Sequence, residues 1–289
     1  MSKLLYHYTT MNTFMSMMEK SLCSEDNDFH PKYLKMWASN YAQQNDPTEC
    51  KWFFDALEKK VKQYVQKHNI VLTPEDEQLL REPSFGMNLF TISFSEQEDD
   101  LTMWYGYGED GDGVSLGFDF SELPNSPMAI CISNKGIDKI PEADTKILYI
   151  KDKPLKCQYV KPDEDFLDDE IVKNTIECLT TVDKELKDLA QGMVCFNNAP
   201  LYKHYKYAQE KEYRIIKTGN NIKYQLIKNN TLRTYIEIKI AISCLKKIVV
   251  GPCKTYNSQK NADLISSYMA TKGLNVEVVG SEIPYRRGL

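Results

Sequence analysis

Two carboxylates and an arginine occupy alternate positions in the segment Glu210-Lys211-Glu212-Tyr213-Arg214. Alternate side chains of a strand point to the same face, so Glu210, Glu212 and Arg214 are expected on one side. Two carboxylates on one face repel each other, and a neighbouring arginine offsets part of that repulsion. We therefore expect Arg214 to act as a brace. The same row of charges is also typical of a solvated edge strand, whose charges discourage aggregation.

Polar side chains also interrupt two other apolar segments. His7 lies in Tyr6-His7-Tyr8-Thr9, and Ser93 and Ser95 share one face of Ile92-Ser93-Phe94-Ser95. Each has a local explanation, a strand end for the histidine and a turn for the serines. A histidine, a serine-rich strand and the two glutamates could instead converge in a cleft. A carboxylate there could hold a ribose hydroxyl and stabilise positive charge that develops on the sugar.

The composition, 42% hydrophobic and 27% charged, is that of an ordinary globular protein. A net charge of −5 argues against nucleic-acid binding driven by bulk charge, and leaves room for a local basic patch. The eight cysteines form no tight pair and the four histidines do not cluster with them, so we expect no metal site and reduced, mostly buried thiols. Without a signal peptide or a bilayer-length apolar run, a cytoplasmic protein with no membrane partner is expected.

The elements that must position these residues are short strands mixed with amphipathic helices. Strands are expected at residues 4–8, 33–38, 88–96, 114–120, 128–132, 145–150, 155–160, 207–216, 222–227, 232–240, 247–250 and 275–279. Helices are expected at residues 11–20, 46–68, 100–107, 163–196 and 258–271. This pattern predicts one α+β domain over residues 1–289, with a split, mostly antiparallel sheet and flanking helices.

Two of these helices carry specific expectations. The helix at 46–68 is predicted to begin with Asp46 as N-cap, Pro47 at the first position and Glu49 as the reciprocal capping partner. The longest helix, about 163–196, has apolar residues every three or four positions and an acidic start that suits the positive helix end. The aromatic residues at 104, 105 and 107 lie at helical spacing and are expected in the core.

Several short motifs occur in an order that resembles the bacterial domain-of-unknown-function family numbered 2971, over essentially the whole chain. They are Tyr6-His7-Tyr8-Thr9, Asn45-Asp46-Pro47-x-Glu49, Ile92-Ser93-Phe94-Ser95, Met103-Trp104-x-x-Tyr107, Gly113-Val114-Ser115-Leu116-Gly117-Phe118-Asp119, Glu210-x-Glu212-Tyr213-Arg214, Lys247-Ile248-Val249-Val250-Gly251-Pro252 and Ile283-Pro284-Tyr285-Arg286. The family implies no activity.

A more distant resemblance implies one. A first-strand histidine followed by threonine, a Ser-x-Ser strand and a late Glu-x-Glu are similar to ADP-ribosyltransferases. This resemblance implies an NAD-dependent transferase, such as a bacterial toxin or defence effector, whose acceptor is a protein, a nucleic acid or a small molecule. It implies that His7 orients the NAD ribose, with Tyr8 and Thr9 beside it.

The same resemblance assigns the later residues. Glu212 would hold the nicotinamide ribose and stabilise the oxocarbenium-like transition state, and Ser93 or Ser95 would brace it. Glu210 would polarise or deprotonate the acceptor. Histidine-type members of that superfamily usually carry a tyrosine on the second strand, where this chain has Phe94 between two serines.

Two other classes of function stay open. Glu210 and Glu212 could join Asp46 and Glu49 in a carboxylate cluster that holds a divalent metal for phosphodiester hydrolysis. Lys211 points away from that face, so the pattern lacks the Glu-x-Lys lysine typical of such sites. Alternatively the protein is a non-catalytic binding or sensing module.

Overall fold

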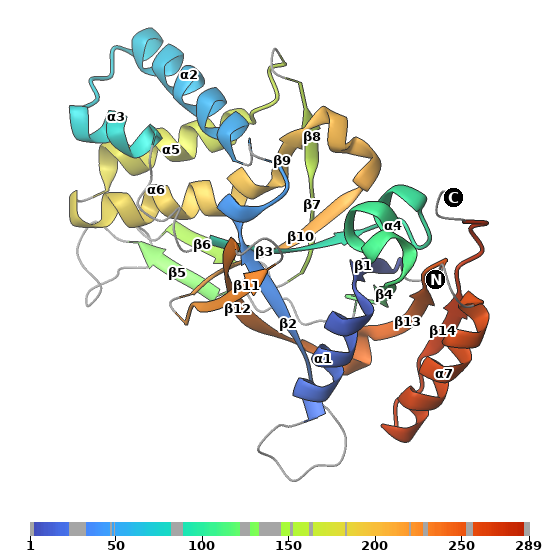
Figure 1. Cartoon of the computed structure of the whole chain (residues 1–289). Helices are drawn as coiled ribbons and strands as arrows, with labels where there is room; N and C mark the ends of the chain where they lie inside the picture. Colours follow the sequence, from blue (N-terminus) through green and yellow to red (C-terminus); the bar gives the residue numbers. More distant parts are fainter. Residues whose placement is uncertain are drawn as a thin grey trace.

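The computed structural model describes residues 3–22, 33–46, 48, 50–81, 89–121, 128–132, 146–150, 153–161, 164–182, 184–219, 221–227, 231–252 and 257–285. In this part, the chain is an α+β protein built on a ten-stranded, mostly antiparallel sheet (Figure 1). The predicted α+β class and the mostly antiparallel character of the sheet are confirmed. The turn at residues 229–230 and the motif residues Pro47, Glu49 and Arg286 lie outside the described residues.

The main sheet follows the order β11-β12-β2-β3-β1-β4-β13-β14, with β10 and β7 branching from β3. Only β13 and β14 pair in parallel within it. The bounds in the main sheet are β1 Leu5–Thr9, β2 Tyr33–Asn40, β3 Leu89–Ser95, β4 Val114–Phe118, β7 Leu155–Lys156, β10 Glu212–Thr218, β11 Lys223–Ile227, β12 Thr231–Ala241, β13 Leu245–Val250 and β14 Glu277–Gly280. Two small sheets pair β5 (Met128–Ile132) with β6 (Lys146–Ile150), and β8 (Gln158–Val160) with β9 (Tyr202–His204).

Helices pack on both faces of this sheet. The α-helices are α1 Met11–Leu22, α2 Lys51–His68, α3 Pro74–Arg81, α4 Leu101–Tyr107, α5 Asp169–Thr181, α6 Lys184–Asn198 and α7 Ser258–Thr271. Short 3-10 helices are η1 Tyr41–Gln43, η3 Glu109–Gly111, η5 Ala199–Leu201, η6 Tyr205–Glu210 and η8 Ile242–Cys244. Helices α2, α3, α5 and α6 form one group, at the upper left of Figure 1. The sequence did not predict α3, which Thr73 and Asp76 cap reciprocally.

The single helix predicted at 163–196 is wrong, because the chain forms two helices that fold back on each other. α5 begins after its N-cap Asp168 and ends at Thr181, before the C-cap Val182, whose backbone is extended. Apolar residues of α5 and α6, among them Cys178, Ala190 and Val194, then pack together. A straight helix rises about 1.5 Å per residue, so the predicted one would be about 50 Å long and would extend far beyond the core. Reversal of the chain lets both halves bury their apolar stripes.

The predicted helix start at Asp46 is also wrong. The Asp46 carboxylate accepts hydrogen bonds from the backbone N–H and the hydroxyl of Thr48, at 2.8 and 2.5 Å. This local turn competes with the helical conformation, and α2 begins only at Lys51. Its end at His68 agrees with the prediction.

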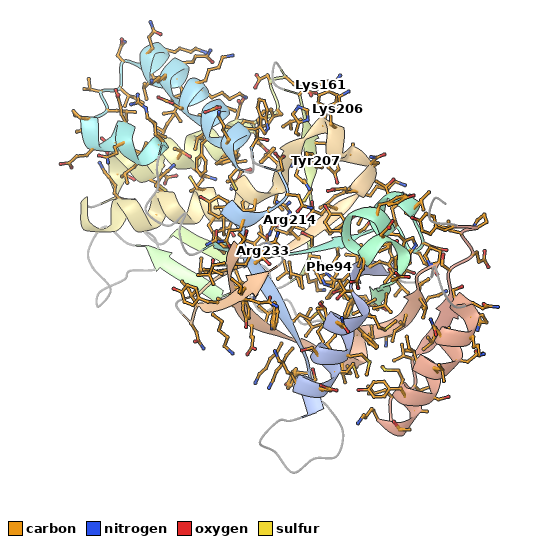
Figure 2. All side chains as sticks on the ribbon, viewed as in Figure 1. Phe94, Lys161, Lys206, Tyr207, Arg214 and Arg233 are labelled. Atoms are coloured by element: carbon orange, nitrogen blue, oxygen red, sulfur yellow. The ribbon has the colours of Figure 1, made fainter. Side chains whose placement is uncertain are left out.

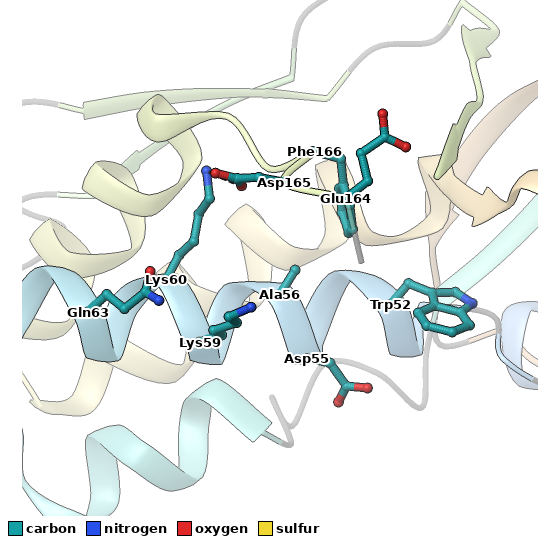
Figure 3. Close-up of a pocket in the computed structure, with 9 residues that line it drawn as sticks. All are labelled: Trp52, Asp55, Ala56, Lys59, Lys60, Gln63, Glu164, Asp165 and Phe166. Atoms are coloured by element: carbon teal, nitrogen blue, oxygen red, sulfur yellow. Dashed lines mark ion pairs between the residues drawn. The ribbon is translucent and has the colours of Figure 1, made fainter. Parts of the chain in front are cut away.

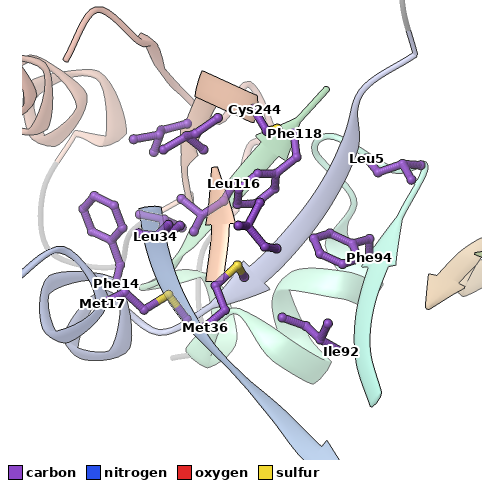
Figure 4. Close-up of a cluster of buried hydrophobic side chains, with 14 of the residues drawn as sticks. Leu5, Phe14, Met17, Leu34, Met36, Ile92, Phe94, Leu116, Phe118 and Cys244 are labelled. Carbon is purple, nitrogen blue, oxygen red and sulfur yellow. The ribbon is translucent and has the colours of Figure 1, made fainter. Parts of the chain in front are cut away.

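The core forms because β-strand alternation places apolar residues on one face of the sheet. On β2, the buried residues Leu34, Met36 and Ala38 alternate with more exposed neighbours. Figure 4 shows Phe14 and Met17 of α1 beside Leu34 and Met36. A second core joins the helical group to Leu89 of β3 and Ile216 of β10, so the helices cover the opposite face of these two strands.

Strands β1 and β3 diverge after one residue pair. They pair only at Tyr6 and Ser95, while β2 pairs with the other end of β3, at Phe90 and Thr91. The stretch 92–94 of β3 thus has no ladder partner on that edge among the described residues. This divergence opens the sheet at the strands that carry the predicted site.

Candidate functional site

A small pocket lies where β1 and β3 diverge. Its cavity volume is about 60 Å³. The lining residues come from β1, β3, α4, η6 and β10, and they are Tyr6, His7, Tyr8, Ser93, Phe94, Met103, Tyr107, Glu210 and Glu212. Residues that are far apart in the sequence thus meet at one site, including five of the predicted set.

Gly117 of β4 makes room for one wall of this pocket. It pairs with Tyr6, and a Cβ at Gly117 would lie 2.7 Å from the Tyr6 ring. A side chain there would displace the tyrosine. Tyr6 can therefore lie across β4, and its hydroxyl donates to Glu98 at 2.9 Å.

Glu210 and Glu212 lie side by side, but strand alternation is not the reason. Glu210 ends the 3-10 helix η6, and β10 begins only at Glu212. Between them Lys211 adopts a left-handed conformation with φ of 44°, which breaks the period of two. The predicted strand over 207–216 is therefore wrong in its first half, although both carboxylates still lie side by side.

Lys203 of β9 joins these carboxylates. Its ammonium lies 2.6 Å from Glu210 Oε2 and 2.7 Å from Glu212 Oε2. Arg214 contacts Glu212 Oε1 through Nε at 2.8 Å, and it donates to the Pro200 carbonyl at 2.5 Å. The predicted role of Arg214 as a brace is confirmed (labelled in Figure 2). All four side chains are buried, and Arg214 is only 1% exposed, so the interpretation as a solvated edge strand is wrong.

The cluster holds Glu212 in its ionised form. Burial disfavours the charged carboxylate, but the positive charges of Arg214 and Lys203 outweigh that effect and lower its pKa to about 2. Burial also disfavours the charged form of Lys203, yet attraction to Glu212 and Glu210 raises its pKa. Glu212 therefore cannot exchange a proton near neutral pH. It can act only as a fixed negative charge and hydrogen-bond acceptor.

Glu210 reaches the pocket through Tyr107. The Tyr107 hydroxyl donates to Glu210 Oε1 at 2.7 Å, and burial together with the Glu210 charge raises the tyrosine pKa. Ser95 fixes the backbone of Glu210, because the Ser95 hydroxyl donates to the Glu210 carbonyl at 2.6 Å. Ser95 thus positions Glu210, whereas the sequence predicted that a serine would brace Glu212.

His7 leaves β1 on the core face, opposite to the face of Glu212. It pairs with buried Leu116, whereas Tyr6 pairs with Ser95, which pairs with Glu212. The His7 ring spans the gap between the strands, and its Nδ1 lies 2.9 Å from the Ser93 carbonyl. It replaces a missing ladder bond there. Burial lowers the pKa of His7, so the ring is neutral at pH 7. Its Nδ1–H donates a hydrogen bond to the Ser93 carbonyl, which can only accept.

The remaining predicted residues divide between the pocket and the core. Tyr8 lines the pocket, and its hydroxyl donates to the Gln97 carbonyl at 2.9 Å. Ser93 lines it as well. Thr9 is buried at the end of β1 and does not line the pocket.

The short aromatic helix α4 differs from its prediction at two of its three aromatic residues. Trp104 is buried, as expected, and its indole donates to Asp99. Tyr105 is 55% exposed, and Tyr107 lines the pocket. Sequence reasoning missed Lys203 and Tyr107 as site residues. A lysine in the aromatic run Leu201-Tyr202-Lys203-His204-Tyr205 is the one local signal that could have singled out Lys203.

The carboxylates considered for a metal do not gather. Among the residues that the structure describes, no group of three or more His, Cys, Asp or Glu could hold an ion. Lys203 lies between Glu210 and Glu212 where a cation would sit. Asp46 contacts Thr48, and Glu49 lies outside the described residues.

A larger hollow of about 300 Å³ lies on the helical group, away from the sheet (Figure 3). It is lined by Trp52 and Lys60 of α2 and by the segment 164–166. Lys60 forms an ion pair with Asp165 across it, at 2.8 Å. Because its charged side chains are mostly exposed or already paired, this hollow is a less specific binding site than the pocket.

Residues 103–215 match the family described as a protein of unknown function, DUF2971. The matched segment includes Tyr107, Lys203, Glu210, Glu212 and Arg214. No curated protein and no solved structure matches the chain. The resemblance to this family is confirmed over these residues, and the likeness to ADP-ribosyltransferases stays a prediction.

The cysteines that the structure describes in full, at positions 50, 157, 178, 195 and 244, are buried and form no disulfide. None of the helices in the described ranges is both long and apolar enough to cross a bilayer.

Proposed function

We propose that this protein cleaves the nicotinamide–ribose bond of NAD and transfers ADP-ribose to an acceptor, at the pocket between β1 and β3. The bond from nicotinamide N1 to ribose C1′ breaks, and its electron pair leaves with nicotinamide, which becomes neutral. An oxygen or nitrogen of the acceptor bonds to C1′, and its proton passes to Glu210. Positive charge develops on the ribose before the new bond is complete.

The charge state of Glu212 fits this reaction. Its low pKa keeps it ionised at any physiological pH, and Arg214 and Lys203 hold it in place. A carboxylate has about four lone-pair sites, so it can accept a ribose hydroxyl in addition to its two cationic partners. Lys203 and Arg214 balance the charge of the carboxylates but do not line the pocket, so a cation that develops in the pocket faces the carboxylate side of the cluster, which lowers its barrier.

The walls of the pocket suit nicotinamide, the group that leaves when the bond breaks. Tyr6, Tyr8, Phe94 and Tyr107 are aromatic, and Met103 is polarisable. Nicotinamide in NAD is a flat cationic ring, which aromatic faces attract. A cavity of about 60 Å³ is smaller than the roughly 150 Å³ that accommodates benzene in an engineered core. The ring therefore requires displacement of a flexible wall residue, and unbranched Met103 is the most adaptable.

The observation that carries this proposal is the buried carboxylate pair Glu210 and Glu212, which lines one pocket with Ser93 and with His7, although His7 leaves β1 on the opposite face. In the ADP-ribosyltransferases that the sequence resembles, residues of these types bind NAD. The proposed role of His7 in orienting the NAD ribose is limited to one ring nitrogen, because its Nδ1 already binds the Ser93 carbonyl. Only its second ring nitrogen is left to accept a hydrogen bond from NAD.

The test combines calorimetric titration with NAD, nicotinamide release, and transfer of labelled ADP-ribose in a cell extract. The wild type should bind NAD and release nicotinamide. Tyr107→Phe and Glu210→Gln should lower transfer to the acceptor more than hydrolysis. Glu164→Gln, which changes an exposed carboxylate in the segment before α5, is the matched control and should behave as wild type.

Two outcomes distinguish the alternatives. A wild type that neither binds NAD nor labels anything in extract overturns the proposal. NAD binding without release or transfer overturns the transferase reaction and leaves a sensing module. The metal-dependent nuclease has no geometric support among the described carboxylates, and strict magnesium dependence of nucleic-acid cleavage would identify it.

A further inference from the structure

The outward face of β2, β12 and β11 is basic and aromatic. Its residues are set by the register that pairs Trp37 with Glu237 and Lys35 with Lys239, and by alternation with the core residues. The face carries Lys35, Trp37, Lys223, Arg233, Tyr235, Glu237 and Lys239, with Tyr33 at its end. Arg233 is labelled in Figure 2. In a chain of net charge −5, four cations against one carboxylate is a marked local excess.

Helix α1 adds one wall to this face. It lies along the edge of β2, where the Ser21 hydroxyl accepts the Lys35 backbone N–H at 3.0 Å. Between α1 and the strands is a groove of about 180 Å³, lined by Asn12, Thr13, Ser16, Met17, Lys20, Lys35, Trp37 and Gln225. The groove thus combines an indole and two lysines with neutral hydroxyl and amide groups. It is separate from the pocket between β1 and β3.

The aromatic side chains form a stack within this face. The rings of Trp37 and Tyr235 are stacked, with centroids 4.4 Å apart. The Lys20 ammonium also lies over the indole, 4.6 Å from its centroid. A lysine on an α-helix surface can change its rotamer. A flat base could then take its place on the indole, and the lysine could pair with the negative phosphate of the same nucleotide.

The lone carboxylate of the face does not cancel its cations. Glu237 pairs with Lys223 at 2.6 Å. Its pKa is lowered, first by that hydrogen bond and then by the charges of Lys223, Lys20 and Lys35. Among the described residues, Lys20, Lys35 and Lys239 have no ion-pair partner; Lys20 lies over the Trp37 ring and Lys239 over the Tyr33 ring.

We propose that this face binds single-stranded nucleic acid, with one base stacked in the groove on Trp37 and the backbone phosphates on Lys20, Lys35 and Lys239. An aromatic platform interleaved with cations is the arrangement that binds unpaired bases and their phosphates together. The cations continue from the groove onto β12, which favours a strand over a single nucleotide. A duplex hides its bases, so it cannot use the indole. This proposal is independent of NAD chemistry.

The test is fluorescence anisotropy of a labelled 12-nucleotide single strand, titrated with the full chain at 50, 100 and 200 mM KCl. Three or four phosphate contacts predict a slope of about −2 to −3 for log affinity against log salt. Lys20→Glu with Lys35→Glu should weaken binding at least tenfold and flatten the slope. Trp37→Leu keeps apolar volume and should weaken binding about tenfold, with the slope unchanged.

Lys67→Glu with Lys260→Glu is the matched control, since both are exposed lysines on helices distant in sequence from this face. It makes the same change in net charge and should leave affinity unchanged. Circular dichroism of each variant shows that it is folded. Absence of wild-type binding at 50 mM KCl overturns the proposal, as does equal loss in the control pair. Equal affinity for duplex, or binding of AMP as tight as binding of the strand, overturns the single-strand assignment.

Discussion

Substitution of Glu212 by glutamine should destabilise the fold, contrary to the expectation that an isosteric change at a catalytic carboxylate is structurally silent. The side chain belongs to a buried cluster of two carboxylates and two cations that is neutral as a whole. Glutamine leaves Lys203 and Arg214 with only Glu210 to balance them. Removal of one partner from such a buried cluster typically costs about 3–5 kcal/mol.

The lowered pKa of Glu212, which arises from the same contacts with Arg214 and Lys203, corresponds to a cost of the same order. It falls from its ordinary 4.5 to about 2 on folding, and each pH unit corresponds to about 1.4 kcal/mol, so ionisation contributes about 3 kcal/mol. Because the folded-state pKa is below the ordinary value, this contribution is complete above pH 4.5 and is lost as the pH falls toward 2. The unfolding free energy of the wild type should therefore fall steeply in that window, and that of Glu212→Gln should fall less.

The assay is urea unfolding at pH 7 of the wild type, Glu212→Gln, Lys203→Met and the double variant. Each single change should lower the unfolding free energy by about 3 kcal/mol. The double change leaves one carboxylate and one cation, so it should be at least about 1 kcal/mol more stable than the sum of the single effects predicts. Glu164→Gln, which is exposed, should stay within about 0.5 kcal/mol of the wild type.

A loss below about 1 kcal/mol for Glu212→Gln, or additive effects in the double variant, would refute the reasoning from a coupled neutral cluster. The double variant also separates stability from chemistry. If Glu212 stabilises the developing ribose cation, the double variant regains stability without regaining turnover, whereas recovery of both would assign Glu212 a purely structural role.

Three further perturbations follow from the same pocket. His7→Asn keeps a donor for the Ser93 carbonyl without a titrating ring. Since burial lowers the His7 pKa, wild-type stability should fall as the pH drops below 6.5, and the variant should lose less stability. Urea midpoints at pH 5.5 and 7.5 would show this difference. Tyr107→Phe removes one hydrogen bond to a charged group and should cost about 1.5–3 kcal/mol; an unchanged midpoint would mean that the Glu210 contact contributes nothing. Met103→Ala widens the pocket at a cost of about 2–5 kcal/mol in stability and should strengthen binding of free nicotinamide; equal affinity in calorimetry would place the ring elsewhere.

The sequence by itself determined the elements whose signals are local. Helix α7 begins and ends at the predicted residues because Asn257 caps it and its apolar period is unbroken. Strand β3 follows from its alternation, and the brace between Arg214 and Glu212 follows from their spacing of two on one strand. Periodicity and capping depend on neighbours in the chain, so they can be predicted without tertiary structure.

Only the tertiary structure decided which charges meet and where the chain turns back. Lys203 pairs with both glutamates because β9 and the helical group pack against β10, and no spacing rule predicts that contact. The apolar period of α5 continues into α6, so the reversal at Val182 is invisible to a periodicity argument. His7 and Glu212 reach one pocket from opposite faces because β1 and β3 diverge after a single pair. Strand divergence and ion pairing depend on distances through space, which a residue's own neighbours in the sequence do not set.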